Sequence, residues 1–181
     1  MTTHQTPTAT PTLVLDEARA LPGALRRSLR HRGTRPSDDL VLVSQWRAGP
    51  ASDHAGPFLT SLTRFTPKHT RDLPGIWLAG IRLADQLIRL DGAVGVATYI
   101  RPGRRSIEVG SLSVWTDEAA LGAFVSLPYH VVIMDRYRPR GLPVHSATWW
   151  SDAPTDVTKE VEDGLRLLDS SNERRVTQRP R

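Results

Sequence analysis

The stretch that decides the fold is GAVGVATYIRPGRRSIEVGSLSVW, residues 92–115. It holds two runs rich in β-branched and apolar residues, 94–101 and 106–115, which are separated by Pro102 and Gly103. Two such runs joined by a Pro-Gly turn predict a β-hairpin. The hairpin gives the fold two adjacent antiparallel strands.

On the N-terminal side of the hairpin, the sequence predicts a helix over 72–88 that Asp72 caps and that Asp91 and Gly92 end. Before this helix, the segments 40–46 and 59–65 have the composition of strands, with a Gly- and Pro-rich loop between them. The helix carries one apolar face, formed by Leu73, Ile76, Trp77, Gly80, Ala84, Leu87 and Ile88.

On the C-terminal side, a second helix is predicted from Thr116, with acidic residues at its positive end. Pro128 should break or kink it, with a further turn or two over 129–137. The segment 144–150 predicts a last strand, and helical spacing of apolar residues from Asp156 onward predicts one peripheral helix followed by a tail.

Read from Leu59, the order is strand, helix, strand, strand, helix, strand, which is the α+β, ferredoxin-like split βαβ (βαββαβ) arrangement. Its two helices cover one face of the sheet and leave the other open. An open face with large apolar residues is usually covered by a second chain, so a homodimer is expected. We expect three segments: a flexible or partly helical extension over 1–39, the ferredoxin-like domain over 40–151, and a C-terminal helix and tail over 152–181.

The composition limits the class of protein. The chain has 181 residues, of which 39% are hydrophobic and 24% charged, and this is typical of one soluble domain. It contains no cysteine, which excludes a disulfide framework and a thiolate zinc site. No apolar run is long enough to span a bilayer and the start resembles no signal peptide, so we expect a cytoplasmic protein without a membrane partner.

Charge and motif spacing exclude further classes. The net charge of +5 is spread along the chain rather than gathered in a stripe, which argues against nucleic-acid binding. The six histidines are scattered without a metal-binding spacing, and no glycine-rich nucleotide loop is present. We therefore expect neither a zinc enzyme nor a Rossmann-type cofactor site.

His130 is the first candidate for chemistry, because a proline break can turn its side chain into the space between helix and sheet. An imidazole with an ordinary pKa near 6.5 is suited to act as a general base at neutral pH. The same residue could instead ligate a haem iron, or be a packed histidine without a chemical role. These three interpretations stay open at the level of the sequence.

Other candidates lie on the predicted strands. Tyr99 and Arg64, taken as neighbours in the sheet, could offer a hydroxyl donor and a cation to a substrate. Trp115 and Trp149 end predicted strands and could line a pocket, although ordinary packing also explains them. His145 shares a strand face with Trp149 and could pair with His130 across the gap between helix and sheet.

One region resembles a known family. The stretch LSVWTDEAAL at 112–121, followed by Ala123-Phe124 and by SLPYH at 126–130, resembles the antibiotic-biosynthesis-monooxygenase-like superfamily of dimeric α+β barrels. In that family a strand ends in Trp, a helix opens with acidic residues and Ala-Leu, and a Ser-Pro-His-like corner follows. The segment from 62–65 through 72–74 to 92–95 is similar to uncharacterised members related to spheroidene monooxygenase. The resemblance covers about 90 residues, from 59 to 150.

The resemblance implies a dimeric α+β barrel with a pocket between sheet and helices. It also implies a small-molecule monooxygenase of secondary metabolism, working without a cofactor on an aromatic or polyketide-like substrate, with His130 as base or orienting residue. Phe124 stands where many members have another histidine, and Tyr129 stands beside the corner histidine, so both are expected at the pocket. A haem-binding oxygenase or haem-handling protein, and a non-catalytic ligand-binding module, are the alternatives within the same superfamily.

Overall fold

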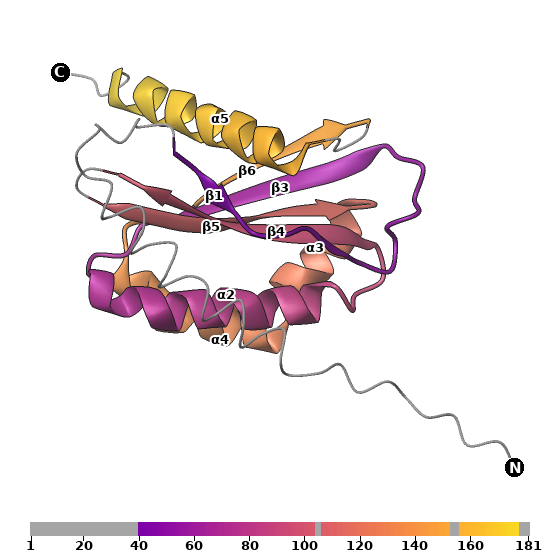
Figure 1. Ribbon diagram of the computed structural model, residues 1–181, viewed down its shortest axis with the longest axis horizontal. Helices are drawn as coiled ribbons and strands as arrows, with labels where there is room; N and C mark the ends of the chain where they lie inside the picture. The colour runs from indigo at the N-terminus through magenta and orange to yellow at the C-terminus, as the bar shows by residue number, and fades with distance from the viewer. Residues whose placement is uncertain (1–39, 104–105, 153–155, 178–181) are drawn as a thin grey trace, which may run out of the picture. The chain divides into compact units, whose positions relative to one another are not determined.

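The computed structural model describes residues 40–103, 106–152 and 156–177, and the side chains of these up to residue 170. The extension expected over 1–39 lies outside the described residues. In chain order the described elements are β1 (Leu42–Val43), β2 (Arg47–Ala48), β3 (Phe58–Phe65), η1 (Thr70–Asp72), α2 (Leu73–Leu87), β4 (Ala93–Pro102), β5 (Ile107–Trp115), α3 (Glu118–Val125), α4 (Pro128–Tyr137), η2 (Arg138–Arg140), β6 (His145–Ser151) and α5 (Val157–Thr177), as labelled in Figure 1.

The sheet has the strand order β1-β4-β5-β3-β6, with β2 also paired to β4, and every pairing is antiparallel. β4 and β5 form the predicted hairpin. β3 lies between β5 and β6. The connection from β3 to β4 through α2 therefore passes over β5, and the connection from β5 to β6 through α3 and α4 passes over β3. This arrangement confirms the ferredoxin-like α+β fold expected from the sequence.

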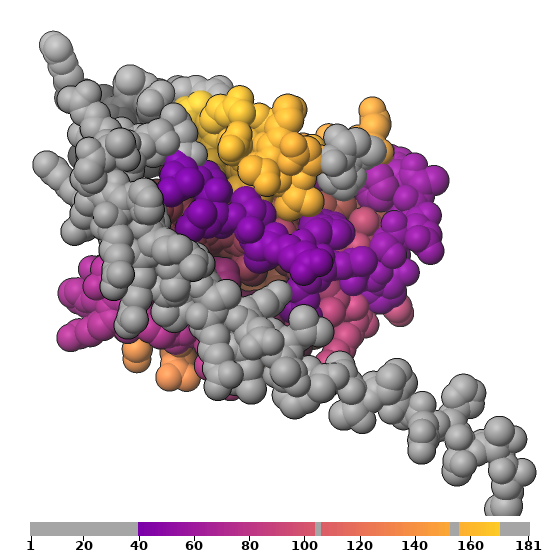
Figure 2. Space-filling view, in the orientation of Figure 1, coloured from indigo at the N-terminus to yellow at the C-terminus, as the bar shows by residue number. Residues whose placement is uncertain are grey.

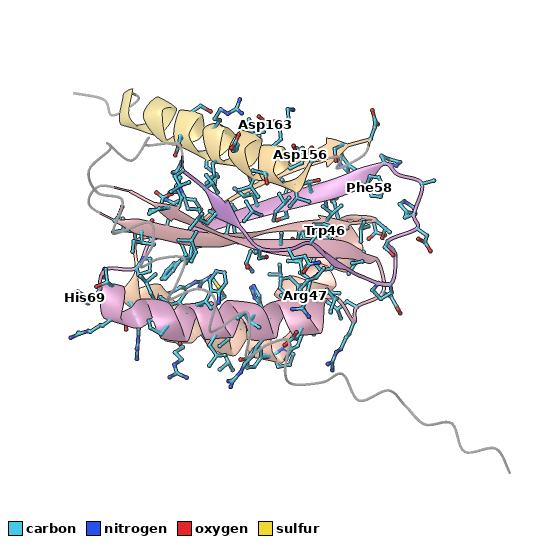
Figure 3. All side chains as sticks on the ribbon, in the orientation of Figure 1. Trp46, Arg47, Phe58, His69, Asp156 and Asp163 are labelled. Atoms are coloured by element: carbon cyan, nitrogen blue, oxygen red, sulfur yellow. The ribbon has the colours of Figure 1, made fainter. Side chains whose placement is uncertain are left out.

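The predicted strand over 40–46 is instead two short pieces, β1 and β2. Between them, Ser44 hydrogen-bonds to β4 through its side chain as well as through its backbone. The Thr98 N–H donates to Ser44 Oγ at 3.0 Å. A side chain that takes the place of a carbonyl interrupts the regular ladder. Past this break, Arg47 extends from β2 to α2, where its guanidinium pairs with Asp85 at 2.6 Å (Figure 3).

Proline and aspartate set the helix boundaries as predicted, with one difference. Asp117 caps α3, since its carboxylate accepts the Ala120 N–H at 2.8 Å. Asp72 makes no such side-chain cap at α2 and instead accepts a hydrogen bond from Arg140 at 3.3 Å. Pro128 is the first residue of α4, because its ring cannot continue α3 but suits a helix start.

The sheet face that the sequence analysis left open is covered by α5 of the same chain. Figure 1 shows α5 on one side of the sheet and α2 and α4 on the other. In the space-filling view α5 adjoins the segment that holds β1 and β2 (Figure 2). The buried cluster that joins α5 to the sheet consists of Val161, Leu165 and Leu168 with Leu62, Tyr99 and Leu112.

This packing corrects the expectation of an open sheet face and of a merely peripheral C-terminal helix. The three apolar residues of α5 recur at helical spacing, so one stripe of the helix can be buried against the strands. The homodimer stays a prediction, and the surface on which it was predicted is occupied by α5. Among the described helices, none is both long and apolar enough to cross a membrane.

Charged residues fix α5 at one end of this interface. The Asp169 carboxylate accepts hydrogen bonds from Arg64 and, at 3.1 Å, from Arg101, which also donates to Glu108 at 2.7 Å. Burial by itself would raise the pKa of Asp169, but the bonds from the two arginines lower it below its ordinary value. The buried Arg64 guanidinium therefore has its counter-ion on α5.

The contact of α5 with the sheet predicts the effect of truncating one side chain. Leu165 is 2% exposed, and we expect Leu165→Ala to lower the free energy of unfolding by about 2–5 kcal/mol through the cavity that it leaves. Leu167 is 47% exposed, so Leu167→Ala should change the free energy of unfolding by less than about 0.5 kcal/mol. Urea denaturation measures both values, and equal effects would contradict the packing described.

Candidate functional site

A cavity of about 610 Å³ lies between the sheet and the helices α2, α3 and α4, on the face opposite α5. The helices contribute mainly hydrocarbon and aromatic side chains to its wall. The main contributors are Ile76, Trp77, Leu83, Leu87, Leu121, Phe124, Val131, Ile133 and Met134. A cavity of this volume has the size of typical small-molecule sites.

The sheet side of the cavity is lined largely by hydroxyl groups. Alternation along each strand sends every second side chain to this face. At those positions stand Ser61, Thr63, Thr98, Ser111, Ser113, Ser146 and Thr148. The sequence analysis missed these residues, although Ser or Thr at every second position, as in 61–63, 111–113 and 146–148, was a readable signal.

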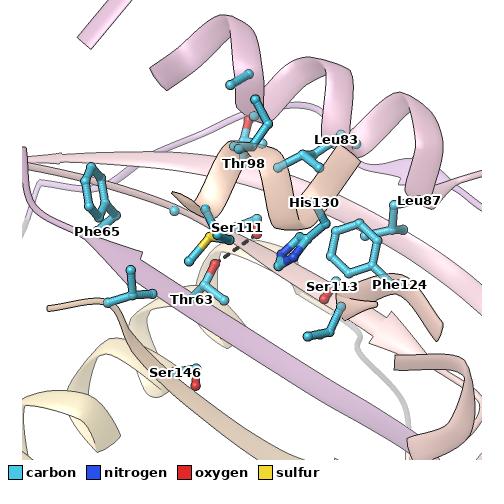
Figure 4. Close-up of a pocket in the computed structure, with 18 of the residues that line it drawn as sticks. Thr63, Phe65, Leu83, Leu87, Thr98, Ser111, Ser113, Phe124, His130 and Ser146 are labelled. Carbon is cyan, nitrogen blue, oxygen red and sulfur yellow. Dashed lines mark hydrogen bonds between the residues drawn. The ribbon is translucent and has the colours of Figure 1, made fainter. Parts of the chain in front are cut away.

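His130 points into the cavity from the first turn of α4, next to Phe124 (Figure 4). The chain is turned at this point because α3 ends at Val125 and Pro128 begins α4. The ring centroids of Phe124 and His130 are 4.9 Å apart in an edge-on arrangement. The proline break thus places the imidazole between an aromatic ring and the hydroxyl-bearing sheet.

The surroundings of His130 favour its neutral form. Burial is the largest cause and lowers the pKa of His130 below its ordinary value, and the positive charge of Arg138 lowers it further. A hydrogen bond with the Val125 backbone opposes the shift without cancelling it. A ring N–H that donates to a carbonyl leaves the other ring nitrogen unprotonated in the neutral imidazole, so that nitrogen can accept a proton.

Of the other predicted pocket residues, only Phe124 lines the cavity. Trp115 is fully buried behind it, with the two ring centroids 5.4 Å apart. The Trp115 indole N–H donates to Ser113 Oγ at 2.9 Å and so orients a hydroxyl of the sheet wall. Tyr129 is not among the residues that line the cavity.

The remaining predicted residues lie on the opposite face of the sheet, which corrects the sequence interpretation. Tyr99 and Arg64 are not on neighbouring strands, because β5 runs between β4 and β3. Trp149 packs against the α5 cluster. His145 pairs in register with Arg64 and, by alternation from Ser146, faces away from His130.

Tyr99 has a structural role under α5. Its ring crosses β5 at Gly110, where a Cβ would collide with the ring and with the Thr63 carbonyl. The hydroxyl donates to that carbonyl at 3.0 Å, and burial raises the pKa of Tyr99 far above its ordinary value. Tyr99 is therefore a neutral hydrogen-bond donor that ties β4 to β3 across β5.

Metal ligands do not gather in the described part of the chain. Within it, no group of three or more His, Asp or Glu side chains is arranged to hold a metal ion. One polar atom at the cavity wall stands out: Trp77 Nε1 is buried and has no hydrogen-bond partner among the described residues. His130 and the hydroxyl groups of the sheet wall can support acid–base and hydrogen-bond chemistry.

Comparison with solved structures finds several partial similarities at low sequence identity. The structure is similar to that of a protein designated an antibiotic biosynthesis monooxygenase from Nitrosomonas europaea, with 13% identity, 56% of this chain and 96% of the other covered, and a TM-score of 0.49. SnoaB, a cofactor-independent oxygenase from Streptomyces nogalater, gives 17% identity, 55% and 98% coverage and a TM-score of 0.46. A conserved protein from Methanosarcina mazei is 12% identical, with 51% of this chain and 91% of the other covered and a TM-score of 0.46.

No protein-family model matches the chain, and no curated protein matches its sequence. Similarities at these identities assign neither a reaction nor a residue role to this chain. Fold and site together define an α+β protein of ferredoxin-like topology with a small-molecule-sized cavity. The cavity has a hydrocarbon wall, a hydroxyl wall and one histidine between them.

The environment of His130 predicts its titration. We expect its NMR signal, assigned with His130→Gln, to titrate with a midpoint below 6.5, because burial disfavours the charged imidazole. Phe124→Ala admits water and should raise the midpoint toward 6.5. The imidazole of His130 takes up a proton more readily in the unfolded chain than in the folded protein. The free energy of unfolding should therefore fall as the pH drops through about 6.5. A midpoint equal to that of the urea-unfolded chain would contradict the site as described.

Proposed function

We propose that this protein is a small-molecule monooxygenase that uses no cofactor and acts on an aromatic, oxygen-bearing substrate in the cavity beside α4. The observation that carries the proposal is the state of His130. Its imidazole lies in the cavity beside Phe124, and burial lowers its pKa, which favours the neutral form whose unprotonated nitrogen can accept a proton from a bound molecule. The choice of oxygen as co-substrate follows the sequence resemblance of 112–130.

The cavity suits a planar molecule with different chemistry on its two sides. The wall formed by α2 and α4 offers hydrocarbon surface, such as Leu83 and Met134, for the faces of an aromatic ring system. The sheet wall offers hydroxyls that both donate and accept hydrogen bonds. These donors can stabilise the negative charge that develops on a substrate oxygen when a nearby C–H bond loses its proton.

The proposed reaction converts an activated CH₂ group into a carbonyl. His130 takes one proton from the carbon, and the electron pair left on the substrate reduces molecular oxygen as a C–O bond forms. The imidazolium returns its proton to the distal oxygen, which gives a hydroperoxide. Loss of water then breaks the O–O bond and the second C–H bond. In sum, CH₂ and O₂ become C=O and H₂O, with the carbon as the only reductant.

Substitution of His130 tests this role directly. With a hydroxylated anthrone as substrate, we expect His130→Gln to lower kcat for oxygen uptake about 100-fold or more, as removal of a general base does. His145→Gln is the matched control, because His145 lies on the other face of the sheet. The wild-type rate should fall on the acidic side with a midpoint below 6.5. Unchanged turnover in His130→Gln would overturn the proposal.

Glycine replacements test whether the cavity is the site. Gly80 lies in the centre of the cavity-facing stripe of α2, with Ile76, Trp77, Leu83 and Ala84 around it, and a Cβ there meets nothing within 4 Å. Gly80→Leu should therefore occupy the cavity and weaken substrate binding at least tenfold. Gly122→Leu, on α3 and also free of contacts within 4 Å, is the control outside the cavity. Equal binding by both variants, measured by fluorescence titration, would place the site elsewhere.

An absorption spectrum separates the rival functions. If added haem gives a sharp Soret band that His130→Gln abolishes, His130 is an iron ligand and the cofactor-free proposal fails. If the substrate binds in the cavity but no oxygen is consumed, the protein is a binding module of the same fold. The proposal requires a protein that ignores haem and consumes oxygen.

A further inference from the structure

The two edges of the sheet differ in how regular they are. On one edge, β1 and β2 are pieces of 2 residues each, with a break at Ser44 between them. On the other edge, β6 runs for 7 residues in unbroken antiparallel register with β3. This strand contains no proline and no Lys, Arg, Asp or Glu, the residues that commonly prevent an edge strand from pairing with another chain. Among the described residues, no strand pairs with the outer side of β6.

Hydrogen bonds at the far edge of the sheet fix the direction of the peptide groups on each strand. The Ser44 N–H donates to the Thr98 carbonyl at 2.8 Å, and the Thr98 N–H donates to Ser44 Oγ at 3.0 Å, so the peptide groups of Thr98 point away from β5. In an antiparallel sheet this direction alternates from strand to strand. Ser111, opposite Thr98, and Thr63, opposite Ser111, therefore direct their peptide groups toward each other. In agreement, the Tyr99 hydroxyl reaches the Thr63 carbonyl across β5 at 3.0 Å.

The same alternation shows which peptide groups of β6 face outward. Ser146 lies opposite Thr63, whose peptide groups point toward β5, so the N–H and C=O of Ser146 point to the outer side of β6. Thr148 and Trp150 follow at every second residue and have the same direction. All three side chains are exposed, and that of Trp150 is 51% exposed although it is large and apolar. We call Ser146, Thr148 and Trp150 the β6 edge.

The cavity is open toward the β6 edge. Ser146 and Thr148 line its sheet wall and are at the same time exposed to solvent. Val125 on α3 and Val131 on α4 also line the cavity, yet they are 49% and 46% exposed. In the described part of the chain, no further strand continues the sheet wall beyond β6. The cavity therefore lacks a wall on this side.

The β6 edge is complementary to a second copy of itself. If two β6 strands pair antiparallel about a two-fold axis at Thr148, Ser146 lies opposite Trp150 of the partner subunit, and the outward peptide groups of all three residues are paired. The neighbouring registers pair only two of the three with each other. On the other face, the same register sets Trp149 opposite Ala147 of the partner subunit. Each tryptophan then meets a small residue, and no like charges face each other.

We infer that the β6 edge binds a second copy of this chain in this register, and that Trp150 of the partner subunit covers the open side of the cavity beside Ser146. A second copy is the occupant because its own β6 matches all three positions by symmetry. The surface is distinct from the sheet face that α5 covers. The inference goes beyond the proposed function and does not rest on it, since the pairing is independent of what the cavity binds.

Single cysteines can locate the interface in the full chain, which has no cysteine of its own. In the inferred register the two Thr148 Cα atoms are ~5.5 Å apart, within the ~4.4–6.8 Å that a disulfide spans. The two Ser146 residues are offset by roughly 14 Å along the strands. With diamide as oxidant, we expect Thr148→Cys to form a covalent dimer about tenfold or more faster than Ser146→Cys, as measured on non-reducing gels. Equal rates, or no covalent dimer of Thr148→Cys, would overturn the inference.

A mixture of two variants tests the position of Trp150. Neither Ser146→Cys nor Trp150→Cys should crosslink with itself, because each is offset from its own copy. The two variants mixed before oxidation should form a covalent heterodimer, since the register places these residues opposite each other. If Thr148→Cys crosslinks but the mixture does not, Trp150 of the partner subunit does not lie beside Ser146 and the inference fails.

Proline at the centre of the β6 edge tests the outward peptide groups. The wild type should sediment as a dimer, and Thr148→Pro should be a monomer with an unchanged Tm, because the N–H that is lost faces outward and is not used by β3. Thr148→Val keeps this N–H and should stay dimeric, as the matched control. A monomeric wild type, or a dimer that persists in Thr148→Pro, contradicts the inference. The cysteine experiments decide it even if the proline variant fails to fold.

Discussion

The constraint on which the structure depends is the alternation of side chains along the two central strands, β3 and β5. Leu62 and Leu112 are paired in register and fully buried under α5. Their pairing obliges the residues on either side of each to face the other way, toward α2 and α4. The same ladder of backbone hydrogen bonds thus produces a dry apolar face and a hydroxyl-lined face. A shift of one residue in register would exchange the two faces and destroy both the core and the cavity.

Local signals in the sequence were sufficient for most of the elements and for the turn that places His130. The hairpin at 92–115, the helix α2 and the break at Pro128 follow from turn residues, apolar spacing and the chemistry of proline, which act over a few residues. The placement of Tyr99 and Arg64 was wrong because it needed the strand order. That order puts β5 between their strands, through contacts between segments distant in the sequence. The same limitation applies to α5, whose apolar stripe is visible in the sequence but whose partner surface is not.

The candidate site shows a similar division. A proline followed by a histidine points to a turned imidazole, and the structure adds what lowers its pKa, namely burial beside Phe124 and the positive charge of Arg138. The hydroxyl wall escaped notice because serine and threonine in strands are also common on solvated faces. Only the register, which aligns Thr98, Ser111 and Thr63 in one row, shows that they form a single surface. A site whose residues come from four strands is therefore harder to predict from the sequence than a single histidine placed by one turn.

The position of α5 also determines where this folding unit ends. A chain that stopped at Ser151 would retain every strand and all the helices of the cavity side, yet it would leave Leu62, Tyr99 and Leu112 in contact with water. It would also leave the Arg64 guanidinium without the carboxylate of Asp169, which is its counter-ion. The C-terminal helix therefore covers, within one chain, the sheet face on which the sequence analysis expected a second subunit. The smallest autonomous unit extends at least to Asp169.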